Sequence, residues 1–408
     1  MMPKASAPKK PWTLMVYMAG DNNLDPDGVK DLKEMKKVGS TNDVNVIAQF
    51  DRATGHAAKR YYLRKGGKVT ADAVANLGKI NTGDPKNLMD FIKWGVKNYP
   101  ADRYALVLWN HGQGWDDTDI YADERHRRLR RLAGGRIRHA LFHVPVRRIL
   151  KRAIGDSEAR AILLDDDAKD FLDNIEMKKV LAGTAKLLKR KLDILGMDAC
   201  LMSMAEVGYQ IHESALFTVG SEQTEPLEGW PYDTILAELV KNPAMAAKDF
   251  STLIVRMYIA SYPHDAVTQS ACDLSRADGL AAAVAGLGNA LTAGLSDAAT
   301  RQRILTARTQ VQSYDVADNI DLVDFCSLLA QATSGSEIAT RCRDAIQAVQ
   351  AGYVVANGSK GEAMKDSHGV AIYFPTGDVS PLYAGLDFSK KTGWDGFLKA
   401  YLKAVRSR

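Results

Sequence analysis

Continuous apolar runs that end in polar residues recur along the first half of the 408-residue chain. Five of these runs have the length of a buried strand: 13–20, 44–51, 104–110, 192–198 and 216–223. Stretches with helical spacing lie between them, near Pro26–Val38, at Pro85–Lys97 and from Leu201 onward. Apolar strands that alternate with amphipathic helices are typical of a mostly parallel sheet covered on both faces. The pattern therefore predicts an α/β fold.

The pattern changes near residue 245, where the chain becomes Ala-rich and mostly helical. Further strands are expected there at 266–274 and 368–375. A chain of this length exceeds the size at which one core stops growing, so more than one unit is expected. We predict a flexible basic tail (1–11), an α/β domain (12–245) and a helix-rich region packed on it (246–408).

Composition is ordinary for a globular protein, with 46% hydrophobic and 25% charged residues. Four cysteines without a CxxC pair argue against a disulfide scaffold and against zinc or thiol–disulfide chemistry. No apolar run approaches the roughly 20 residues that cross a bilayer. The apolar TLMVYMA after the basic tail is only strand-length, so we expect no signal peptide in this chain. Export of a longer precursor is left open.

Polar residues at the strand ends are the site candidates, because ligands of parallel sheets bind beyond the carboxyl ends of the strands. The candidates are Asp21, Asn22, His111, Asp198, Cys200 and Glu222. His111 and Cys200 form a chemical pair, since an imidazole or a helix N-terminus activates a thiol. If His111 and Cys200 act as such a pair, we expect the N–H groups of Gly112 and Cys200 to donate to the developing oxyanion. A buried core cysteine and a structural histidine are equally compatible with the residues alone.

Five segments carry a resemblance to a known family. WTLMVYMAGDNNLD (12–25), NHGQGW (110–115), GMDACLMSMAEVGYQI (196–211), GSEQTEPLEGWPY (220–232) and HGVAIYFP (368–375) resemble the clostripain family of cysteine peptidases. The resemblance implies a caspase-like α/β/α sandwich and a His–Cys dyad, here His111 and Cys200. It also implies cleavage after Arg or Lys, and activation by a cut between the dyad residues. A secreted bacterial protein would fit it.

Residues near the dyad are the candidates for substrate binding. Asp198 shares a strand face with Cys200 and can hold a cationic side chain, although an Asp there can also cap a helix. A second acid is expected from the next loop, either Glu225 or the slightly preferred Glu228. Trp230 is expected to wall the pocket or to anchor its loop. For AGDNNLD (19–25) a turn-making role is favoured over a catalytic one.

The resemblance raises the question of calcium binding, because clostripain-like peptidases can depend on calcium. The best local candidate is DDDAKDFLDNIE (165–176). It fails as an EF-hand loop, since Lys169 stands at position 5 and Asp170 replaces the glycine at position 6. A solvated acidic loop is favoured over a looser carboxylate site. No metal is expected in the chemistry, and calcium activation remains a family-based expectation.

A basic segment lies between His111 and Cys200. The stretch Arg125–Gly155 holds ten arginines, one lysine and no acid, and without it the net charge of +5 becomes −6. Such a segment can bind nucleic acid or an anionic membrane, but its only aromatic residue is Phe142, which argues against base stacking. A processing segment over 125–160 is favoured. Its candidate cleavage sites are Arg125, Arg127, Arg128, Arg130 and Arg131.

The sequence therefore predicts a cysteine endopeptidase for peptides or proteins with Arg or Lys before the scissile bond. Its two fragments are expected to stay associated after self-cleavage, and no nucleic-acid partner or membrane span is expected. Two alternatives stay open: a catalytically silent homologue, and a protein that binds an anionic polymer through the Arg-rich segment.

Overall fold

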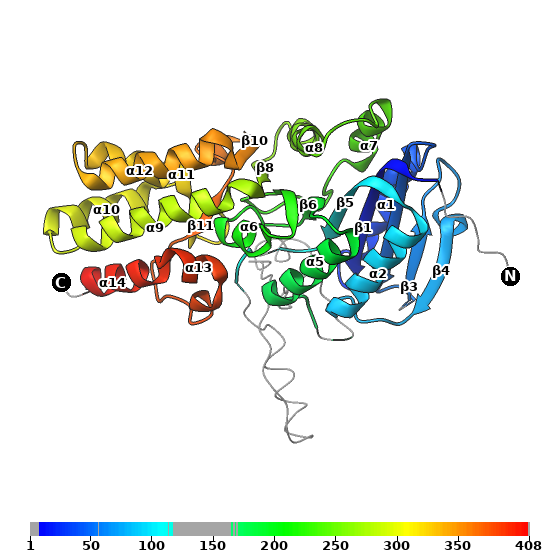
Figure 1. The fold of residues 1–408 in the computed structure, drawn as a ribbon, viewed down its shortest axis with the longest axis horizontal. Helices are drawn as coiled ribbons and strands as arrows, with labels where there is room; N and C mark the ends of the chain where they lie inside the picture. Colours follow the sequence, from blue (N-terminus) through cyan, green and yellow to red (C-terminus); the bar gives the residue numbers. More distant parts are fainter. Residues whose placement is uncertain are drawn as a thin grey trace, which may run out of the picture.

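The computed structural model describes residues 8–55, 57–112, 114–116, 165, 168 and 170–406. Among these residues a nine-stranded sheet runs in the order β10-β8-β7-β6-β5-β1-β2-β3-β4 (Figure 1). Its strands are β1 (Lys10–Gly20), β2 (Val44–Arg52), β3 (Ala58–Tyr62), β4 (Ala73–Gly78), β5 (Ala101–Trp109), β6 (Leu192–Asp198), β7 (Ala215–Gly220), β8 (Val267–Asp273) and β10 (Val354–Lys360). A separate pair is formed by β9 (Asn319–Asp321) and β11 (Ala371–Tyr373).

The centre of the sheet is parallel and its two margins are antiparallel. Strands β7, β6, β5, β1 and β2 run parallel to one another. Strands β3 and β4 add antiparallel pairs at one margin, and β8 and β10 do so at the other. The carboxyl ends of the five central strands therefore meet along one edge, which is where a ligand site is expected.

Helices cover both faces of this sheet. One face carries α1 (Asp25–Val38), α7 (Tyr232–Lys241) and α8 (Ala247–Ser261), and the other carries α2 (Pro85–Asn98), α5 (Asn174–Leu188) and α6 (Ala205–Ile211). Successive side chains of β1 point to opposite faces of the sheet. Leu14 and Val16 pack in the core cluster on one face, and Met15 and Tyr17 pack in the cluster on the other. The predicted α/β fold with helices on both faces is confirmed.

The region after residue 245 is rich in helices but is also part of the sheet. Its remaining helices are α9 (Ala277–Gly294), α10 (Ala298–Gln310), α11 (Leu322–Ala332), α12 (Glu337–Ala348), α13 (Asp387–Thr392) and α14 (Trp394–Arg406). They gather beyond the β10 margin, at the left of Figure 1. Because β8 and β10 extend the main sheet, this region is joined by strand hydrogen bonds as well as by packing. The boundary at 245 stays a prediction.

Three strands of the nine-stranded sheet escaped the sequence analysis, namely β3, β4 and β10, and so did the three-residue β9 of the separate pair. The three missed strands of the large sheet lie at its antiparallel margins, and most of their residues are partly or fully exposed. They consequently lack the continuous apolar runs that mark the central strands. Within the described part of the chain, no helix has both the length and the hydropathy to span a bilayer.

Candidate active site

Two adjacent strand ends bring His111 and Cys200 together. Strands β5 and β6 are parallel neighbours, with Trp109 opposite Asp198. The Asn110 N–H continues the pairing by donating to the Asp198 carbonyl at 3.2 Å. His111 and Cys200 each follow the last residue of their strand by two positions, so they leave the same edge of the sheet side by side. Both line one cavity.

The backbone after Cys200 does not enter a helix. Leu201 adopts a left-handed conformation (φ 63°), and its N–H donates to the Gln223 carbonyl at 3.1 Å. The Ser203 N–H donates to the Ser221 carbonyl at 2.9 Å, so these groups bond to the loop after β7 instead of to a helical turn. Helix α6 begins only at Ala205. The expectation of a helix from Leu201 is wrong, and no helix N-terminus supports a Cys200 thiolate.

The Cys200 side chain is buried, with 7% of its surface exposed. The Glu225 N–H donates to its Sγ atom at 3.2 Å. Burial raises the pKa of the thiol to about 12, although the N–H groups of Glu225 and Gly112 act in the opposite direction. In this conformation the nucleophile candidate is a neutral thiol under the loop that carries Glu225.

His111 is buried beside the thiol and contacts Asn23. Burial lowers the pKa of His111 to about 4, so its imidazole is neutral at pH 7. Its Nε2 atom lies 2.9 Å from Oδ1 of Asn23, which can accept the Nε2–H and leave the lone pair on Nδ1. The turn-making role belongs instead to Asn22, whose Oδ1 accepts from the Leu24 N–H at 2.8 Å. The sequence analysis missed Asn23.

Gly112 allows the two loops to touch. A Cβ atom at this position would stand 2.1 Å from the Cys200 carbonyl oxygen and 2.8 Å from its nitrogen. No side chain fits there without moving the backbone of Cys200. The Gly112 N–H is also one of the groups that act on the thiol. The backbones of Gly112 and Cys200, whose N–H groups are the predicted oxyanion donors, therefore lie close together.

The cavity at this site is small, at about 40 Å³. It is wide enough for a few water molecules but not for an arginine side chain. Besides His111 and Cys200, its lining residues are Leu24, Trp109, Asn110, Asp198, Ala199, Glu225, Pro226, Leu227 and Gly229. Four of these belong to the loop after β7, which covers the thiol. A longer ligand needs that loop, 223–229, to move.

Two buried acids, Asp198 and Glu225, line the cavity with the thiol, and a third buried acid, Asp31, lies near Asp198. Burial raises the pKa of Asp198 to about 6, and burial and Asp198 together raise the pKa of Asp31 to about 9. The carboxyl group of Glu225 is hydrogen-bonded to Asp198, and its pKa is also raised, by burial and by that neighbour. The Tyr232 hydroxyl donates to Asp198 at 2.7 Å. Such a cluster favours the binding of a cation.

Asp31 escaped the sequence analysis because it lies in α1, far from Asp198 along the chain. It accepts a hydrogen bond from Trp109 Nε1 at 2.6 Å. The helix-cap alternative for Asp198 is wrong, since the cap position of α6 is Met204 and no side chain caps it. Asp198 therefore does not cap α6.

The other candidates occupy different positions. Glu228, the preferred second acid, is exposed and does not line the cavity, whereas Glu225 does. Trp230 is 1% exposed and packs over Gly196 of β6, so it anchors the loop to the sheet. Glu222 is buried elsewhere and accepts from the Gly369 N–H at 3.0 Å. The basic segment 125–160, with its five candidate cleavage sites, lies outside the described residues.

The sequence model of the clostripain family of peptidases (C11) matches residues 16–127 and 151–401. These ranges include His111, Cys200, Asp198 and Glu225. The chain belongs to the clostripain family. The family assignment made from the five sequence segments is thus confirmed.

Clostripain from Hathewaya histolytica is 27% identical over 270 residues, which cover 59% of this chain and 44% of clostripain. The match thus spans less than half of that relative. Among solved structures, a secreted C11 cysteine protease from Bacteroides thetaiotaomicron in complex with an irreversible peptide inhibitor is 20% identical, with a TM-score of 0.64; 95% of this chain and 100% of that one are covered. An inactive zymogen C11 protease from Parabacteroides distasonis is also 20% identical, with a TM-score of 0.66 and coverages of 95% and 99%. These similarities confirm the caspase-like α/β/α sandwich of the clostripain family.

Carboxylates that could hold a metal gather at a neighbouring part of the same sheet edge. Asp21, Asp51 and Asp165 are buried, and their ligand atoms lie within 4.8 Å of one another. Asp21 and Asp51 stand at the ends of β1 and β2, and Asp165 was position 1 of the rejected EF-hand loop. Asp165 also accepts from the N–H groups of Thr82 and Ala168, at 3.1 and 2.6 Å. Carboxylate oxygens are the ligand type that calcium prefers, so the set fits that ion.

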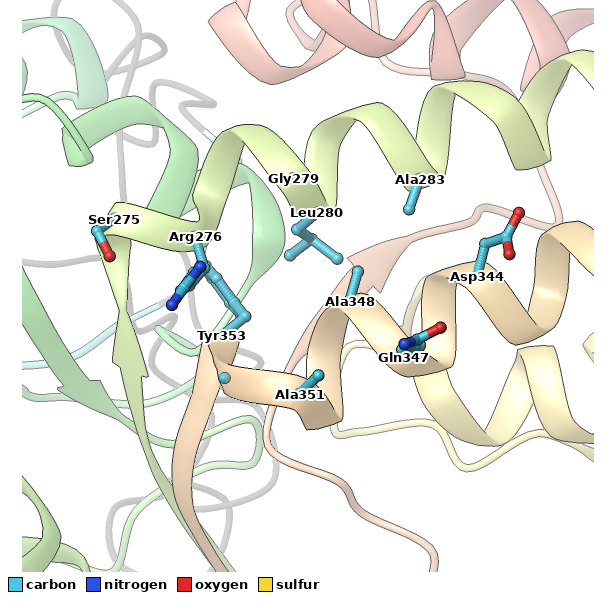
Figure 2. Close-up of a pocket in the computed structure, with 11 residues that line it drawn as sticks. Ser275, Arg276, Gly279, Leu280, Ala283, Asp344, Gln347, Ala348, Ala351 and Tyr353 are labelled. Carbon is cyan, nitrogen blue, oxygen red and sulfur yellow. The ribbon is translucent and has the colours of Figure 1, made fainter.

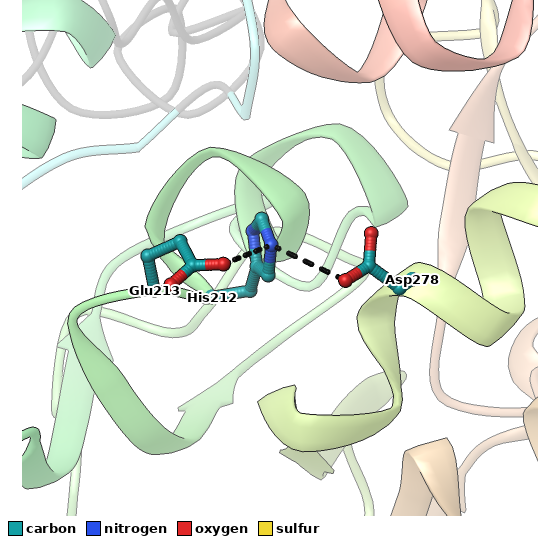
Figure 3. Close-up of side chains that lie close together, drawn as sticks. All are labelled: His212, Glu213 and Asp278. Carbon is teal, nitrogen blue, oxygen red and sulfur yellow. Dashed lines mark ion pairs between the residues drawn. The ribbon is translucent and has the colours of Figure 1, made fainter.

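Two further features lie away from the dyad. His212 faces the carboxylates of Glu213 and Asp278 at 3.2 and 3.9 Å (Figure 3). A cavity of about 430 Å³ is lined by residues of α9 and α12, of the turn before α9, which holds Arg276, and of the turn after α12, which holds Tyr353 (Figure 2). Neither feature shares a residue with the cavity at Cys200.

Proposed function

We propose that this member of the clostripain family is a cysteine endopeptidase that cleaves after Arg or Lys. One observation carries the proposal: His111, Cys200 and two buried acids, Asp198 and Glu225, line the same cavity. A thiol beside an imidazole is the arrangement of nucleophilic cysteine catalysis. Buried carboxylates beside it supply the charge that a substrate guanidinium or ammonium requires.

In the proposed reaction the Cys200 sulfur attacks the scissile carbonyl carbon while its proton passes to His111. The carbonyl oxygen becomes an oxyanion and accepts hydrogen bonds from the N–H groups of Gly112 and Cys200, each worth roughly 3–4 kcal/mol. Collapse breaks the C–N bond, and the imidazolium gives its proton to the leaving amine. Water then attacks the thioester while His111 takes a proton from that water. The C–S bond breaks, the imidazolium returns the proton to the Cys200 sulfur, and the new carboxylic acid is released.

Neutral side chains suit this scheme. A thiol with a raised pKa and an imidazole with a lowered pKa do not form a stable ion pair at rest. The proton therefore moves as the sulfur attacks, which is general base catalysis. Asn23 contributes by accepting the Nε2–H of His111, since this bond fixes the tautomer in which Nδ1 is the base. Asn23 is a positioning residue in this proposal.

Specificity would reside in the acid cluster. A substrate cation entering beside Cys200 would replace the proton that Asp198 and Glu225 share, and so separate the like charges of the two carboxylates. Because the cavity is too small for such a side chain as it stands, the loop 223–229 must move on binding. The covered thiol is consistent with a latent form, which a cut within 125–160 would release. The inactive zymogen among the similar structures gives this latency a parallel.

Calcium is proposed as an activator by family membership, with Asp21, Asp51 and Asp165 as the residues that would hold it. The ion would neutralise three buried carboxylates next to the turn that contains Asn23. The measurement is the thermal unfolding midpoint of the Cys200→Ala protein with calcium and with magnesium. A rise with calcium that Asp51→Asn abolishes would support the assignment, and equal midpoints in all conditions would remove it.

The function is tested by hydrolysis of fluorogenic peptides that end in Arg, Lys, Asp or Leu. The wild type is expected to cleave the Arg and Lys peptides, and Cys200→Ala and His111→Ala are expected to lose nearly all hydrolysis while remaining folded. Wild-type turnover by a folded Cys200→Ala protein would overturn the proposal. Binding to heparin or DNA without any hydrolysis would instead favour the anionic-polymer alternative, and neither activity would favour a silent homologue.

A further inference from the structure

A larger cavity lies beside α1, on the side of the helix away from the dyad. Its volume is about 620 Å³, within the range of small-molecule sites. It shares no lining residue with the cavity at Cys200. The residues around it come from α1, β2, β3 and the loops that follow β2 and β3: Val29, Leu32, Lys33, Phe50, Arg52, Thr54, Gly55, Ala57, Lys59, Tyr61, Gly67, Lys68, Val69 and Thr70.

The floor of this α1 cavity is apolar and carries one polar atom without a partner. Leu32, Phe50 and Tyr61 are at most 4% exposed, and Val29 and Val69 stand beside them. Within the described residues, the Tyr61 hydroxyl makes no hydrogen bond to a protein atom. A hydroxyl in this position gains from a ligand that can accept its proton.

The rim of the α1 cavity is cationic. Four lining residues are basic, namely Lys33, Arg52, Lys59 and Lys68, and none is acidic. Arg52 is already held by Asp25, with its Nε 2.7 Å from that carboxylate. Among the described residues the three lysines have no ion-pair partner. The excess of positive charge is local, because the chain outside Arg125–Gly155 is net negative.

We propose that the α1 cavity binds a small carboxylate with an acyl chain. The apolar floor would take the chain, while the lysines and the Tyr61 hydroxyl would hold the head group. The lysine ammonium groups can bind a carboxylate or a phosphate, so dodecyl phosphate is the comparison that tests the proposed carboxylate head group. The size of the cavity suits a chain of about 10–12 carbons.

Such a ligand would act as an effector of the peptidase, and this second part rests on the proposed function. Arg52 holds Asp25, the first residue of α1, and Asn23 lies two residues before it. Asn23 in turn contacts His111. A carboxylate that competes with Asp25 for Arg52 would therefore alter the segment that positions the imidazole.

Binding is tested by calorimetry on the full-length Cys200→Ala protein, with dodecanoate as the probe below its micellar concentration. We expect saturable binding with one site. Dodecyltrimethylammonium has the same chain with the opposite charge, and acetate has the charge without the chain; both should bind at least about tenfold more weakly. Dodecyl phosphate tests the head group, since tighter binding of dodecyl phosphate than of dodecanoate would overturn the assignment of a carboxylate.

The location of the binding site is tested with the double variant Lys33→Glu/Lys68→Glu, which changes two exposed lysines. The affinity for dodecanoate should fall at least about tenfold in this variant. The matched control is Lys65→Glu, an exposed lysine outside the cavity, which should bind as the parent protein does. Tyr61→Phe should weaken binding by a smaller factor without a change in the thermal unfolding midpoint. Equal binding by the double variant and the control, or equal binding of both dodecyl charges, would overturn the site.

The effector role has its own measurement. Dodecanoate should change kcat/KM for the Arg peptide in the wild type and not in Lys33→Glu/Lys68→Glu. Dodecanoate binding without any change in kcat/KM would overturn the effector role but would still support the binding site. Failure of the proposed peptidase function would show as absent hydrolysis in every sample and would not affect the calorimetry.

Discussion

His111 Nε2 lies 2.9 Å from Asn23 Oδ1, so the imidazole beside Cys200 is held by a side chain from the loop after β1. Strand β1 is the neighbour of β5, the strand that ends before His111. The sheet thus delivers three adjacent strand ends to one site: Asn23 after β1, His111 after β5 and Cys200 after β6. A third group that orients the imidazole is a recurrent feature of activated nucleophiles.

The first prediction concerns this contact. Asn23→Ala should lower kcat about 10-fold or more with little change in KM, because the imidazole loses its fixed tautomer while the substrate contacts remain. Asn23→Asp keeps an acceptor and adds a negative charge, which favours the imidazolium and should move the acid limb of kcat upward in pH. The measurement is kcat against pH for the three proteins. Identical profiles would show that the contact does not serve catalysis.

The second prediction concerns Gly112. Gly112→Ala should lower hydrolysis by about 100-fold or more, because its Cβ would displace the backbone of Cys200 and with it an oxyanion donor. The thermal unfolding midpoint should fall as well, since overpacking typically costs about 1–3 kcal/mol. The matched control is Gly377→Ala, where the added Cβ meets nothing within 4 Å. Full activity in Gly112→Ala would remove Gly112 from the oxyanion site.

The central strands and the proposed dyad residues could be predicted from the sequence because their signal is local. A run such as 192–198, buried along its whole length, is recognisable without its neighbours, and the residue two positions after it lies at the edge where ligands bind. His111 and Cys200 were both found in this way. The resemblance of five segments to the clostripain family then predicted the caspase-like fold and the pairing of these two residues, which the apolar pattern alone could not.

The groups that escaped detection depend on contacts between distant segments. Asp31 reaches Asp198 only because α1 packs over the same sheet face, and nothing in its local sequence marks it. The choice between Glu225 and Glu228 depends on how one loop folds over the thiol. The late start of α6 depends on two backbone hydrogen bonds from the Cys200 loop to the segment after β7. Helical spacing of apolar residues did not reveal this.

The third prediction concerns specificity and its pH dependence. Asp198→Asn should lower kcat/KM for the Arg peptide about 100-fold and leave the Leu peptide almost unchanged, since a desolvated charge pair is worth about 2–5 kcal/mol. With a pKa of about 6, Asp198 is protonated and neutral below that pH and charged above it. The wild-type kcat/KM for the Arg peptide should therefore fall as the pH drops through about 6. In Asp198→Asn, the fall in kcat/KM near pH 6 should be absent, and only the fall near pH 4 that follows protonation of His111 should remain.

Two variants separate the candidate second acids. Glu225→Gln should lower kcat/KM for the Arg peptide, as Asp198→Asn does, because Glu225 lines the cavity. Glu228→Gln is the matched control and should change kcat/KM less than about threefold, because its side chain is exposed outside the cavity. The reverse order of the two effects would assign the role to Glu228. Unchanged Arg-peptide kinetics in both Asp198→Asn and Glu225→Gln would contradict a cation pocket.

The fourth prediction concerns self-cleavage. The wild type should cut itself within 125–160, giving an N-terminal fragment with His111 and a C-terminal fragment with Cys200. The fragments should stay associated, because β5 of the first pairs with β6 of the second from Ala105–Ile194 to Trp109–Asp198. Denaturing intact-mass measurement should show two species, and native mass measurement should show one. Cys200→Ala should remain a single chain in both.

A variant with Gln at the five positions Arg125, Arg127, Arg128, Arg130 and Arg131 distinguishes this cluster from the other basic residues of the segment. If the cut falls among the five, this variant should stay intact, and its thiol should stay covered by the loop that carries Glu225. It should then hydrolyse the Arg peptide at least about tenfold more slowly than the processed wild type. Rates of cutting that do not change with protein concentration would make the reaction intramolecular. A wild type that is fully active as one uncut polypeptide would contradict both the processing role of the basic segment and the latency of the covered thiol.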